Sequence, residues 1–391
     1  MSPTATVAGP RTIAGLTVED IDSIIADGRA LPAAFYTSPE FRALEDEMIF
    51  AHAWQLVGSR LDFAAAGDYV TTKIAQVPVV VVRDDSGELN AFVNVCRHRA
   101  STVMEGSGSC RRMQCGYHGW TYGLDGSLRG VPKFAEGNLP PFETLGLRPI
   151  HLETFAGLVF VALEPIETLA EQLGDMPQML ERAGYDFPFD NPDLELQSLG
   201  GPADYDGVVR GNWKVFYENS SECYHCPSVH QETVCEVMRD EDIQIEVNPT
   251  GRFGMVAGLP LKPEWQERVP SGKAGSPFGF AIYSFWPNTI LFSGHAGEHL
   301  TRYEPAGPGG VRYWARSYSR PDQDLGVLNE MLDVLFVKGN DEDMAVVEAT
   351  QTGLESGYYS PGPLMQGPER VIGSFQRHVW DALRPALAEG A

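Results

Sequence analysis

The segments Cys96-Arg-His98 and, after sixteen further residues, Cys115-Gly-Tyr-His118-Gly-Trp decide how this chain folds. Each segment carries one cysteine and one histidine. Two such pairs on separate loops can hold one binuclear iron–sulfur cluster, with the cysteines on one iron and the histidines on the other. A Cys2His2 zinc site also uses two pairs of ligands, but zinc fingers place both cysteines in one pair and both histidines in the other. The pattern therefore predicts a [2Fe-2S] cluster held by Cys96, His98, Cys115 and His118.

The sequence around these loops predicts a small antiparallel β-domain. β-Branched runs at 67–74 and 78–83 indicate strands, and Asp84-Asp-Ser-Gly87 is expected to turn into a third strand at 89–95. Asp125-Gly126 predicts a hairpin turn after the second loop, and residues 151–163 are expected to hold the last strands. Upstream, a short helix is expected over 18–26. Ser38 and Pro39 favour the start of another helix that continues to about residue 53.

A second candidate metal centre lies between Asn212 and His230, in a stretch that contains Glu222 and His225. On a helix, residues 222 and 225 would share one face, and Pro227 is expected to bend or end that helix. Two histidines and one carboxylate suit ferrous iron and leave positions free for dioxygen.

The third ligand of that centre is sought in Asp341-Glu342-Asp343. A solvated acidic helix start would suit Asp341 and Glu342 better than Asp343.

Six cysteines without an export signal are expected to bind metal or to remain thiols. Cys110 and Cys235 fall outside the ligand patterns and are taken as ordinary thiols. Cys223 and Cys226 could form a zinc site with His225 and His230. A helix, however, would direct the two cysteines to a different face from His225, and such a site would leave Glu222 without a role.

The second half of the chain alternates strands with helices. Strands are expected over 194–199, 205–210, 253–259, 278–286, 289–293, 299–304 and 310–319, and helices over 325–354 and 368–387. A curved antiparallel sheet that grips a long helix suits this order.

Composition excludes several classes of partner. A net charge of −24 argues against nucleic acid, whose phosphates require a basic surface. Without an apolar run of membrane length or a signal peptide, we expect a cytoplasmic protein that does not enter a membrane. The chain has no Gly-x-Gly-x-x-Gly motif, so any nicotinamide-dependent reductase must be a separate polypeptide.

With their flanking residues Arg97, Arg99, Gly116, Tyr117 and Trp120, the two Cys–His loops resemble those of the Rieske non-haem iron oxygenases. The resemblance implies an α+β fold. Residues 45–165 would form an antiparallel β Rieske domain. Residues 1–44 and 166–391 would form a helix-grip catalytic domain with a curved antiparallel sheet.

The resemblance also implies roles for single residues. Asp343 matches the third ligand of Fe(2+), because Glu348 and Gln351 follow it at the spacing usual in the family. Glu222 matches an acidic residue that bridges the mononuclear centre and the cluster of a neighbouring subunit in a homotrimer. Most members have Asp at that position.

The segments Glu222-Cys-Tyr-His-Cys-Pro227 and Gln351-Thr-Gly-Leu-Glu-Ser-Gly-Tyr358 look like those of the branch that acts on glycine betaine, carnitine, choline and stachydrine. This implies a terminal oxygenase that hydroxylates an N-methyl group with O2 and releases formaldehyde. Electrons would come from NAD(P)H through a separate flavin or iron–sulfur reductase, with or without a ferredoxin. An aromatic ring-hydroxylating oxygenase is the alternative. A pure [2Fe-2S] electron carrier is a further one.

A quaternary ammonium substrate would need an aromatic cage. Candidates on the expected strands are Tyr283, Phe285, Trp286, Phe292, Tyr313 and Trp314, among which the sequence does not choose. His295 and His299 are expected in the pocket or in a loop. His52, His151 and His378 are expected to be structural.

Overall fold

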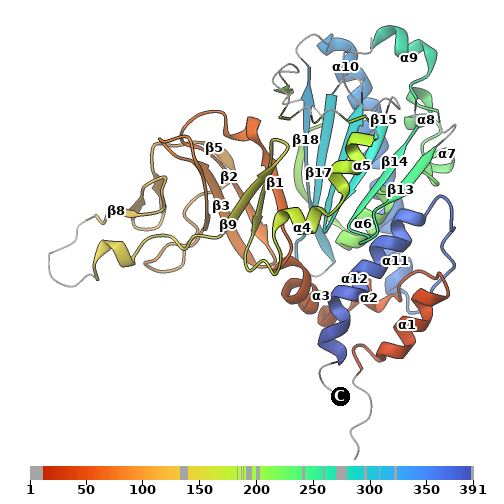
Figure 1. Ribbon diagram of the computed structural model, residues 1–391, viewed down its shortest axis with the longest axis horizontal. Helices are drawn as coiled ribbons and strands as arrows, with labels where there is room; N and C mark the ends of the chain where they lie inside the picture. The colour runs from red at the N-terminus through yellow and green to blue at the C-terminus, as the bar shows by residue number, and fades with distance from the viewer. Residues whose placement is uncertain are drawn as a thin grey trace, which may run out of the picture.

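Figure 1 shows the computed structural model. It describes residues 12–132, 140–182, 184–185, 187, 189–190, 196–199, 203–239, 243–258, 260–269, 280–294, 297–307, 309–320 and 324–388. The first ten strands form one lobe. The later strands form a large sheet in a second lobe, where helices α1 and α12, from the two ends of the chain, lie close together.

The helices before the first lobe begin where the sequence predicts. Helix α1 (Val18–Ala26) has a capping box, in which Thr17 and Asp20 bond each other's backbone N–H groups. Helix α3 (Pro39–Glu45) is capped by the Ser38 side chain, starts on proline and continues as the π-helical segment η1 (Asp46–Phe50).

The first lobe consists of three small antiparallel sheets, ordered β4-β3-β2-β5, β1-β10-β9 and β6-β7-β8. Their strands are β1 (Gln55–Ser59), β2 (Asp68–Ile74), β3 (Val77–Arg83), β4 (Leu89–Val93), β5 (Ser107–Ser109), β6 (Met113–Gln114), β7 (Thr121–Tyr122), β8 (Leu128–Gly130), β9 (His151–Phe155) and β10 (Leu158–Ala162). Residue alternation divides strand β3 between two cores. Val80 and Val82 join the core beneath the two Cys–His loops, while Val79 and Val81 join the main core shared with the second lobe. The two lobes are therefore packed together through apolar side chains.

The second lobe is built on an antiparallel sheet ordered β11-β18-β17-β16-β15-β14-β13, with β12 also paired to β18. The strands are β11 (Gln197–Ser198), β12 (Tyr205–Arg210), β13 (Gln244–Val247), β14 (Phe253–Ala257), β15 (Phe280–Phe285), β16 (Thr289–Gly294), β17 (Gly297–Pro305) and β18 (Gly310–Ser319). The first two residues of each expected strand over 194–199 and 278–286 lie outside the described residues. Strand β13 and the short helix α9 (Pro263–Arg268) were not predicted.

One face of this sheet packs on a long helical run. Helix α10 (Leu325–Leu332), the π-helical segment η4 (Asp333–Lys338) and helix α11 (Gly339–Glu355) follow without a break, over the predicted range. Phe336 of η4 stacks on His299 of β17 with ring centroids 3.8 Å apart. Helix α12 (Arg370–Ala388) packs beside strand β13 and helix α1. The predicted α+β class, with an antiparallel sheet that grips a long helix, is confirmed.

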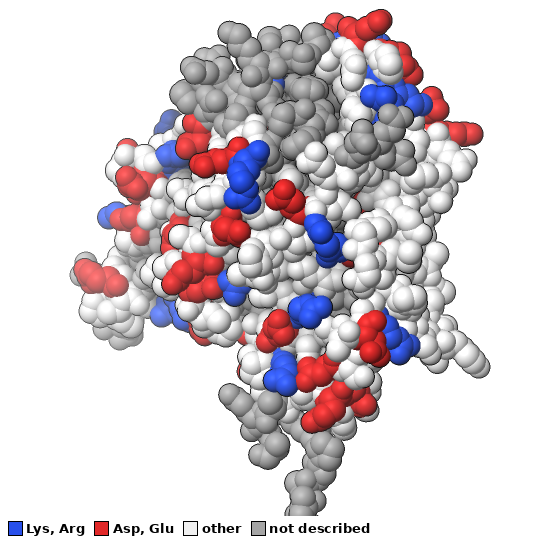
Figure 2. All heavy atoms as spheres, turned by 45° about the vertical axis from the view of Figure 1, so that its right-hand side comes forward, with Lys and Arg blue, Asp and Glu red and all other residues white. Residues whose placement is uncertain are grey.

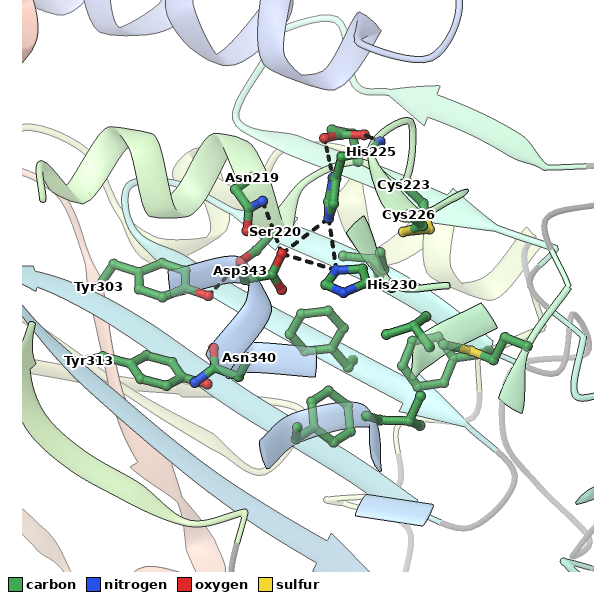
Figure 3. Close-up of a pocket in the computed structure, with 18 residues that line it drawn as sticks. Asn219, Ser220, Cys223, His225, Cys226, His230, Tyr303, Tyr313, Asn340 and Asp343 are labelled. Carbon is green, nitrogen blue, oxygen red and sulfur yellow. Dashed lines mark hydrogen bonds and ion pairs between the residues drawn. A yellow bond between two sulfur atoms is a disulfide. The ribbon is translucent and has the colours of Figure 1, made fainter. Parts of the chain in front are cut away.

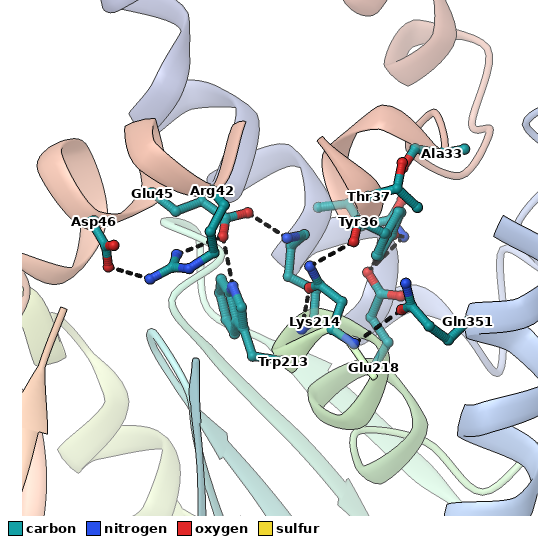
Figure 4. A network of polar contacts seen from close by, with 12 residues as sticks. Ala33, Tyr36, Thr37, Arg42, Glu45, Asp46, Trp213, Lys214, Glu218 and Gln351 are labelled. Atoms are coloured by element: carbon teal, nitrogen blue, oxygen red, sulfur yellow. Dashed lines mark hydrogen bonds and ion pairs between the residues drawn. The ribbon is translucent and has the colours of Figure 1, made fainter. Parts of the chain in front are cut away.

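The amino-terminal helices are fastened to helix α6 (Trp213–Ser220) by a buried polar network (Figure 4). Glu45 accepts a 2.8 Å hydrogen bond from the Trp213 indole and pairs with the buried Lys214 ammonium. The Tyr36 hydroxyl donates a 2.8 Å hydrogen bond to Glu218. Because α6 leads directly into the stretch with His225 and His230, this network fixes the direction from which that stretch enters the site.

The described surface agrees with the acidic composition. On the face drawn in Figure 2, lysine and arginine side chains lie singly among aspartates and glutamates rather than in a contiguous basic stripe. None of the helices in the described part of the chain is long and apolar enough to cross a membrane.

Candidate functional site: two metal centres and an aromatic cavity

The two Cys–His loops lie side by side at one end of the first lobe. Cys96 and Cys115 are buried, whereas His98 and His118 are exposed. The two imidazole rings have their centroids 4.6 Å apart, and His98 stacks on Trp120 at 4.9 Å. The four residues that the sequence selects are therefore brought together, with the thiols inside and the imidazoles at the surface.

The donor set of these loops fits a [2Fe-2S] cluster. The Tyr122 hydroxyl lies 3.3 Å from Cys96 Sγ and accepts a hydrogen bond from the Arg97 backbone N–H. Burial opposes ionisation of Cys115, but hydrogen bonds from backbone N–H groups of the same loop and contact with Cys96 bring its pKa below the ordinary value. Two buried cysteines and two exposed imidazoles match Rieske ligation.

The second centre is formed by a loop rather than by the helix that the sequence suggested. Helix α6 ends at Ser220, and Pro227 lies in the first turn of the short helix α7 (Cys226–Val229). Glu222 and His225 still meet, because the loop returns Glu222 Oε1 to within 2.5 Å of His225 Nδ1. The expectation of a shared helical face was wrong, and the contact that it was meant to explain is made by the turn.

Three ligand atoms converge beside this loop (Figure 3). Nε2 of His225 and Nε2 of His230 are 3.2 Å apart, and Oδ1 of Asp343 lies 3.2 Å from the first and 3.1 Å from the second. Helix α11 supplies Asp343. A 3.0 Å hydrogen bond from the backbone N–H of Asn212, the N-cap of α6, to the Gln351 side chain of α11 holds the two helices together. Asn219 donates a 3.2 Å hydrogen bond to the same Asp343 oxygen.

This triangle has the dimensions of a metal site. Ligand atoms about 2.1 Å from one ion and at right angles to one another would lie about 3.0 Å apart. The three observed separations are within about 0.2 Å of that value. Two imidazoles and one carboxylate on one face leave further positions for small molecules, which suits ferrous iron.

Each histidine is held by a second carboxylate on its other ring nitrogen. Glu222 Oε1 contacts His225 Nδ1, and Glu342 Oε2 lies 2.7 Å from His230 Nδ1 and 2.5 Å from the Thr233 hydroxyl. Such partners fix the tautomer that presents Nε2 to a metal. Glu342, which the sequence left open as a ligand, therefore lies behind a histidine, and Asp341 is exposed at the surface.

The carboxylates govern the charge of the metal-free site. Burial disfavours the imidazolium of His225, but Asp343 and Glu222 outweigh it and raise the pKa of His225 to about 10. Burial also opposes the imidazolium of His230, but the carboxylates Asp343 and Glu342 raise its pKa. Burial opposes the carboxylate of Asp343, but the two imidazoles lower its pKa. A divalent cation bound between His225, His230 and Asp343 would replace the imidazolium protons that attract the carboxylate to the two rings.

Cys223 and Cys226 form a disulfide, which the sequence did not predict. The Cys226 sulfur lies within 4.8 Å of the ligand nitrogens of His225 and His230, but it is bonded to Cys223 and is not a free thiolate. Because a loop replaces the expected helix, the two cysteines meet each other. Cys110 and Cys235 are not part of a disulfide, and both are only partly buried.

A cavity of about 600 Å³, counting its opening to solvent, adjoins the three ligand atoms. Its aromatic walls are Phe280, Phe292, Tyr303, Tyr313 and Phe336. The described lining residues include the carboxylates of Glu222 and Asp343 and no lysine or arginine.

Alternation along the strands decides which expected aromatic residues reach this cavity. Phe292 and Tyr313 face it, whereas Tyr283, Phe285 and Trp314 lie in the core on the opposite face of the sheet. Trp286 packs against Phe375 and His378. The sequence missed Phe280, Tyr303 and Phe336. Period-two alternation from Phe292 through its paired strands could have identified the first two, because paired residues share a face.

The other described histidines do not line the cavity beside the ligand triangle. Nδ1 of His52 lies 2.7 Å from the Glu164 carbonyl, and His378 accepts a hydrogen bond from Arg252. His151 lies edge-on to Trp54. His299 is buried in strand β17, and His295 lies outside the described residues.

Two family models match the chain. A Rieske [2Fe-2S] domain matches residues 53–155, and the catalytic domain of the ring-hydroxylating alpha subunit matches residues 192–384. The first match contains both Cys–His loops and the second contains the three converging ligand residues.

Curated relatives extend over most of the chain. Chloroplastic choline monooxygenase of Spinacia oleracea is 31% identical over 394 residues, which cover 97% of this chain and 83% of that protein. The glycine betaine monooxygenase oxygenase subunit of Pseudomonas aeruginosa is 30% identical, with 88% of this chain and 87% of that protein covered. The carnitine monooxygenase oxygenase subunit of Acinetobacter pittii is 28% identical, with 87% and 89% covered.

Solved structures share the fold. The quaternary ammonium Rieske monooxygenase CntA in complex with L-carnitine superposes with a TM-score of 0.77 at 25% identity, and covers 93% of this chain and 98% of that one. Naphthalene 1,2-dioxygenase from Rhodococcus sp. gives 0.76 at 23% identity, with 95% and 98% covered. With both domain models, a relative above 30% identity and a site built for iron, this chain belongs to the Rieske non-haem iron oxygenases, as an oxygenase alpha subunit with a [2Fe-2S] cluster and a mononuclear iron.

Proposed function

We propose that this enzyme is the terminal oxygenase of a monooxygenase that demethylates a quaternary ammonium compound. The observation that carries the proposal is the cavity beside the ligand triangle. Five aromatic rings and two carboxylates line it, and its described lining holds no lysine or arginine. Aromatic faces attract a methylated ammonium group, and the carboxylates add attraction of the same sign. The names of the curated relatives, which act on choline, glycine betaine and carnitine, agree with such a cavity.

The ligand assignment is part of this proposal. Cys96 and Cys115 would hold one iron of the cluster, and His98 and His118 the other. His225, His230 and Asp343 would hold the mononuclear iron, supported by separations of 3.1–3.2 Å between their ligand atoms. When bound, the cluster supplies single electrons, and the ferrous iron binds and activates dioxygen.

Glu222 is proposed as the bridge between the centres. Its Oε1 receives the His225 ring N–H, and its Oε2 receives the backbone N–H groups of Tyr224 and His225. A carboxylate has about four acceptor sites, so one more N–H can be accepted. That donor would be His118 of a neighbouring subunit in a homotrimer. One solved relative is described by its inter-subunit electron transfer, which supports this arrangement.

The domain division belongs to the same proposal. Residues 45–165 would carry the cluster, and residues 1–44 and 166–391 the mononuclear iron. The separate core beneath the Cys–His loops supports the first unit, and the polar network of Figure 4 joins the amino-terminal helices to the second. A separate NAD(P)H-dependent reductase would supply the electrons.

Product analysis tests the substrate class. The holoenzyme, a matched reductase and NADH would be incubated with trimethylammonium compounds and, in parallel, with naphthalene and indole. We expect formaldehyde and the demethylated amine in equal amounts, with one O2 and one NADH consumed per turnover and one water formed. Hydroxylated arene without formaldehyde would contradict the proposal and support the aromatic ring hydroxylase, the function of the naphthalene dioxygenase fold neighbour.

A further inference from the structure

A disulfide closes the loop that carries the first proposed iron ligand. Cys223 and Cys226 are bonded to each other, and the two residues between them are Tyr224 and His225. In Figure 3 the two bonded sulfur atoms lie beside the rings of His225 and His230. The bond is therefore part of the wall of the metal site.

One of the two sulfurs is close enough to become a metal ligand. Cys226 Sγ and a ring nitrogen of each of His225 and His230 lie within 4.8 Å of one another. A thiolate about 2.3 Å from an ion, at right angles to histidine nitrogens about 2.1 Å from it, would lie about 3.1 Å from each nitrogen. Rotation of the Cys226 side chain covers a difference of this size once the bond to Cys223 is open.

The disulfide can be approached from outside the iron cavity. Cys223 lines the cavity beside the ligand triangle and also a hollow of about 920 Å³, counting its opening, between this loop, strand β13 and the start of helix α12. Tyr224 lines the same hollow and is 55% exposed. A small dithiol in this hollow meets Cys223 without entering the cavity proposed for the substrate.

The loop has contacts that hold it when the disulfide is open. Glu222 accepts hydrogen bonds from the backbone N–H groups of Tyr224 and His225. The Cys226 carbonyl accepts the backbone N–H of His230 in the first turn of α7. None of these bonds involves a sulfur atom, so His225 and His230 stay together in the thiol form.

The two states of Cys226 suit different metals. A disulfide sulfur carries no charge, so the closed form offers a metal two imidazoles and one carboxylate, with positions left for dioxygen. A thiolate is a strong ligand for soft and borderline ions such as Zn(2+) and would fill one of those positions. The Cys-x-x-Cys spacing is also that of disulfides that exchange with external thiols.

We propose that the Cys223–Cys226 pair is a redox switch of the mononuclear site. An external dithiol opens the bond: it supplies two electrons and two protons, becomes a disulfide itself and leaves two thiols on this chain. Cys226 then releases its proton as its sulfur joins His225 and His230 on the metal. The thiolate takes a position that dioxygen needs, so the thiol form binds metal more tightly and oxygenates more slowly. An oxidised dithiol closes the bond again. This inference rests on the proposed ligand set and adds a redox-dependent ligand to it.

The test uses the full chain with its cluster and with Co(2+) in place of the mononuclear iron. X-ray absorption at the cobalt edge reports on this site alone, because the cluster contains iron. The protein is treated with an oxidised dithiol, or with a phosphine reductant that is removed before metal is added. We expect nitrogen and oxygen neighbours alone in the disulfide form. The thiol form should add one sulfur at about 2.3 Å and bind Co(2+) at least about tenfold more tightly. In the iron-loaded parent, formaldehyde release should be lost on reduction and return on reoxidation.

Two variants separate metal binding by sulfur from opening of the loop, because both lack the disulfide. Cys223→Ser leaves Cys226 as a thiol and should show the cobalt–sulfur contact without reductant. Cys226→Ser should show no such contact after either treatment. Cys235→Ala is the matched control, because Cys235 Sγ lies 3.4 Å from the Cys226 carbonyl oxygen, and this variant should respond as the parent does.

The outcomes separate this inference from the proposed ligand set. If His225→Ala binds Co(2+) as tightly as the parent, the ligand assignment fails. If cobalt binds at His225 but no sulfur neighbour appears in the thiol form, or if Cys223→Ser and Cys226→Ser give the same cobalt spectrum, the role of Cys226 is wrong. A parent whose peptides show no disulfide by mass spectrometry after oxidation also contradicts the switch. If the serine variants do not fold, as judged by melting and the cluster spectrum, the two forms of the parent decide.

Discussion

Replacing Glu342 with alanine would remove the carboxylate behind one proposed iron ligand without touching the metal face. Glu342 Oε2 lies 2.7 Å from His230 Nδ1, and a charge-assisted hydrogen bond of this kind contributes about 1.5–3 kcal/mol. The Glu342 side chain is 33% exposed, so solvent screening favours the lower end of that range. A loss of about 1.5 kcal/mol would weaken Fe(2+) binding about tenfold.

The assay is a titration of the mononuclear site with Fe(2+) against a competing chelator, in protein that keeps its cluster. Asp341→Ala is the matched control, because Asp341 is exposed one residue away on the same helix. We expect the cluster spectrum to be unchanged in both variants and the Fe(2+) affinity to fall only in Glu342→Ala. Equal affinities in Glu342→Ala and the parent, or an equal loss in Asp341→Ala, would refute the assigned role of Glu342.

Four further predictions follow from the same contacts. Asp343→Ala should abolish oxygenation and leave the cluster spectrum intact; full activity would move the ligand to a neighbour. Glu222→Gln should keep both metals but slow electron arrival, seen as a slower single turnover after reduction, and an unchanged rate would exclude the bridge. Because the pKa of His225 is raised to about 10, metal must displace a proton at neutral pH, so Fe(2+) affinity should rise about tenfold per pH unit from 6 to 9; a flat profile would contradict this. Burial raises the pKa of Glu218 to about 7, so the free energy of unfolding of the parent should fall by up to about 3 kcal/mol as pH rises from 4.5 to 7. In urea unfolding, Glu218→Gln should lose less stability over the same pH range. The same pH dependence of stability in the parent and the variant would contradict this.

Local signals predicted the elements well. The cap at Thr17 and the hydroxyl and proline at Ser38 and Pro39 give helices that begin where expected, because these groups satisfy backbone N–H groups within a few residues. The strand over 310–319 is found as predicted. Such features depend on neighbours in sequence, so the sequence alone contains the information.

Features set by distant partners were harder to predict. Helix α6 was expected to extend through His225, but it ends at Ser220 because the loop that follows is held by Glu222 and by the Cys223–Cys226 disulfide. The sequence and its family resemblance proposed Asp343, with Asp341 and Glu342 as alternatives. Only the packing of α11 on α6 shows that Asp343 faces both histidines and Glu342 lies behind one of them.

The aromatic cavity shows the same limit. Strand patterns name aromatic residues but not which face of the sheet meets the long helix, so Tyr283 and Trp314 were candidates although they lie in the opposite core. Phe336 comes from a helix that contacts the sheet only in the folded protein. The ligand roles themselves stay predictions.

Metal analysis joined to electron paramagnetic resonance tests the central claim, that one chain carries two distinct iron centres. The purified protein should contain about three iron atoms and two acid-labile sulfides per chain, with a cluster signal on reduction and a separate mononuclear signal that is lost in His225→Ala. Zinc in place of iron, or a cluster with no metal at His225 and His230 after iron loading, would contradict it.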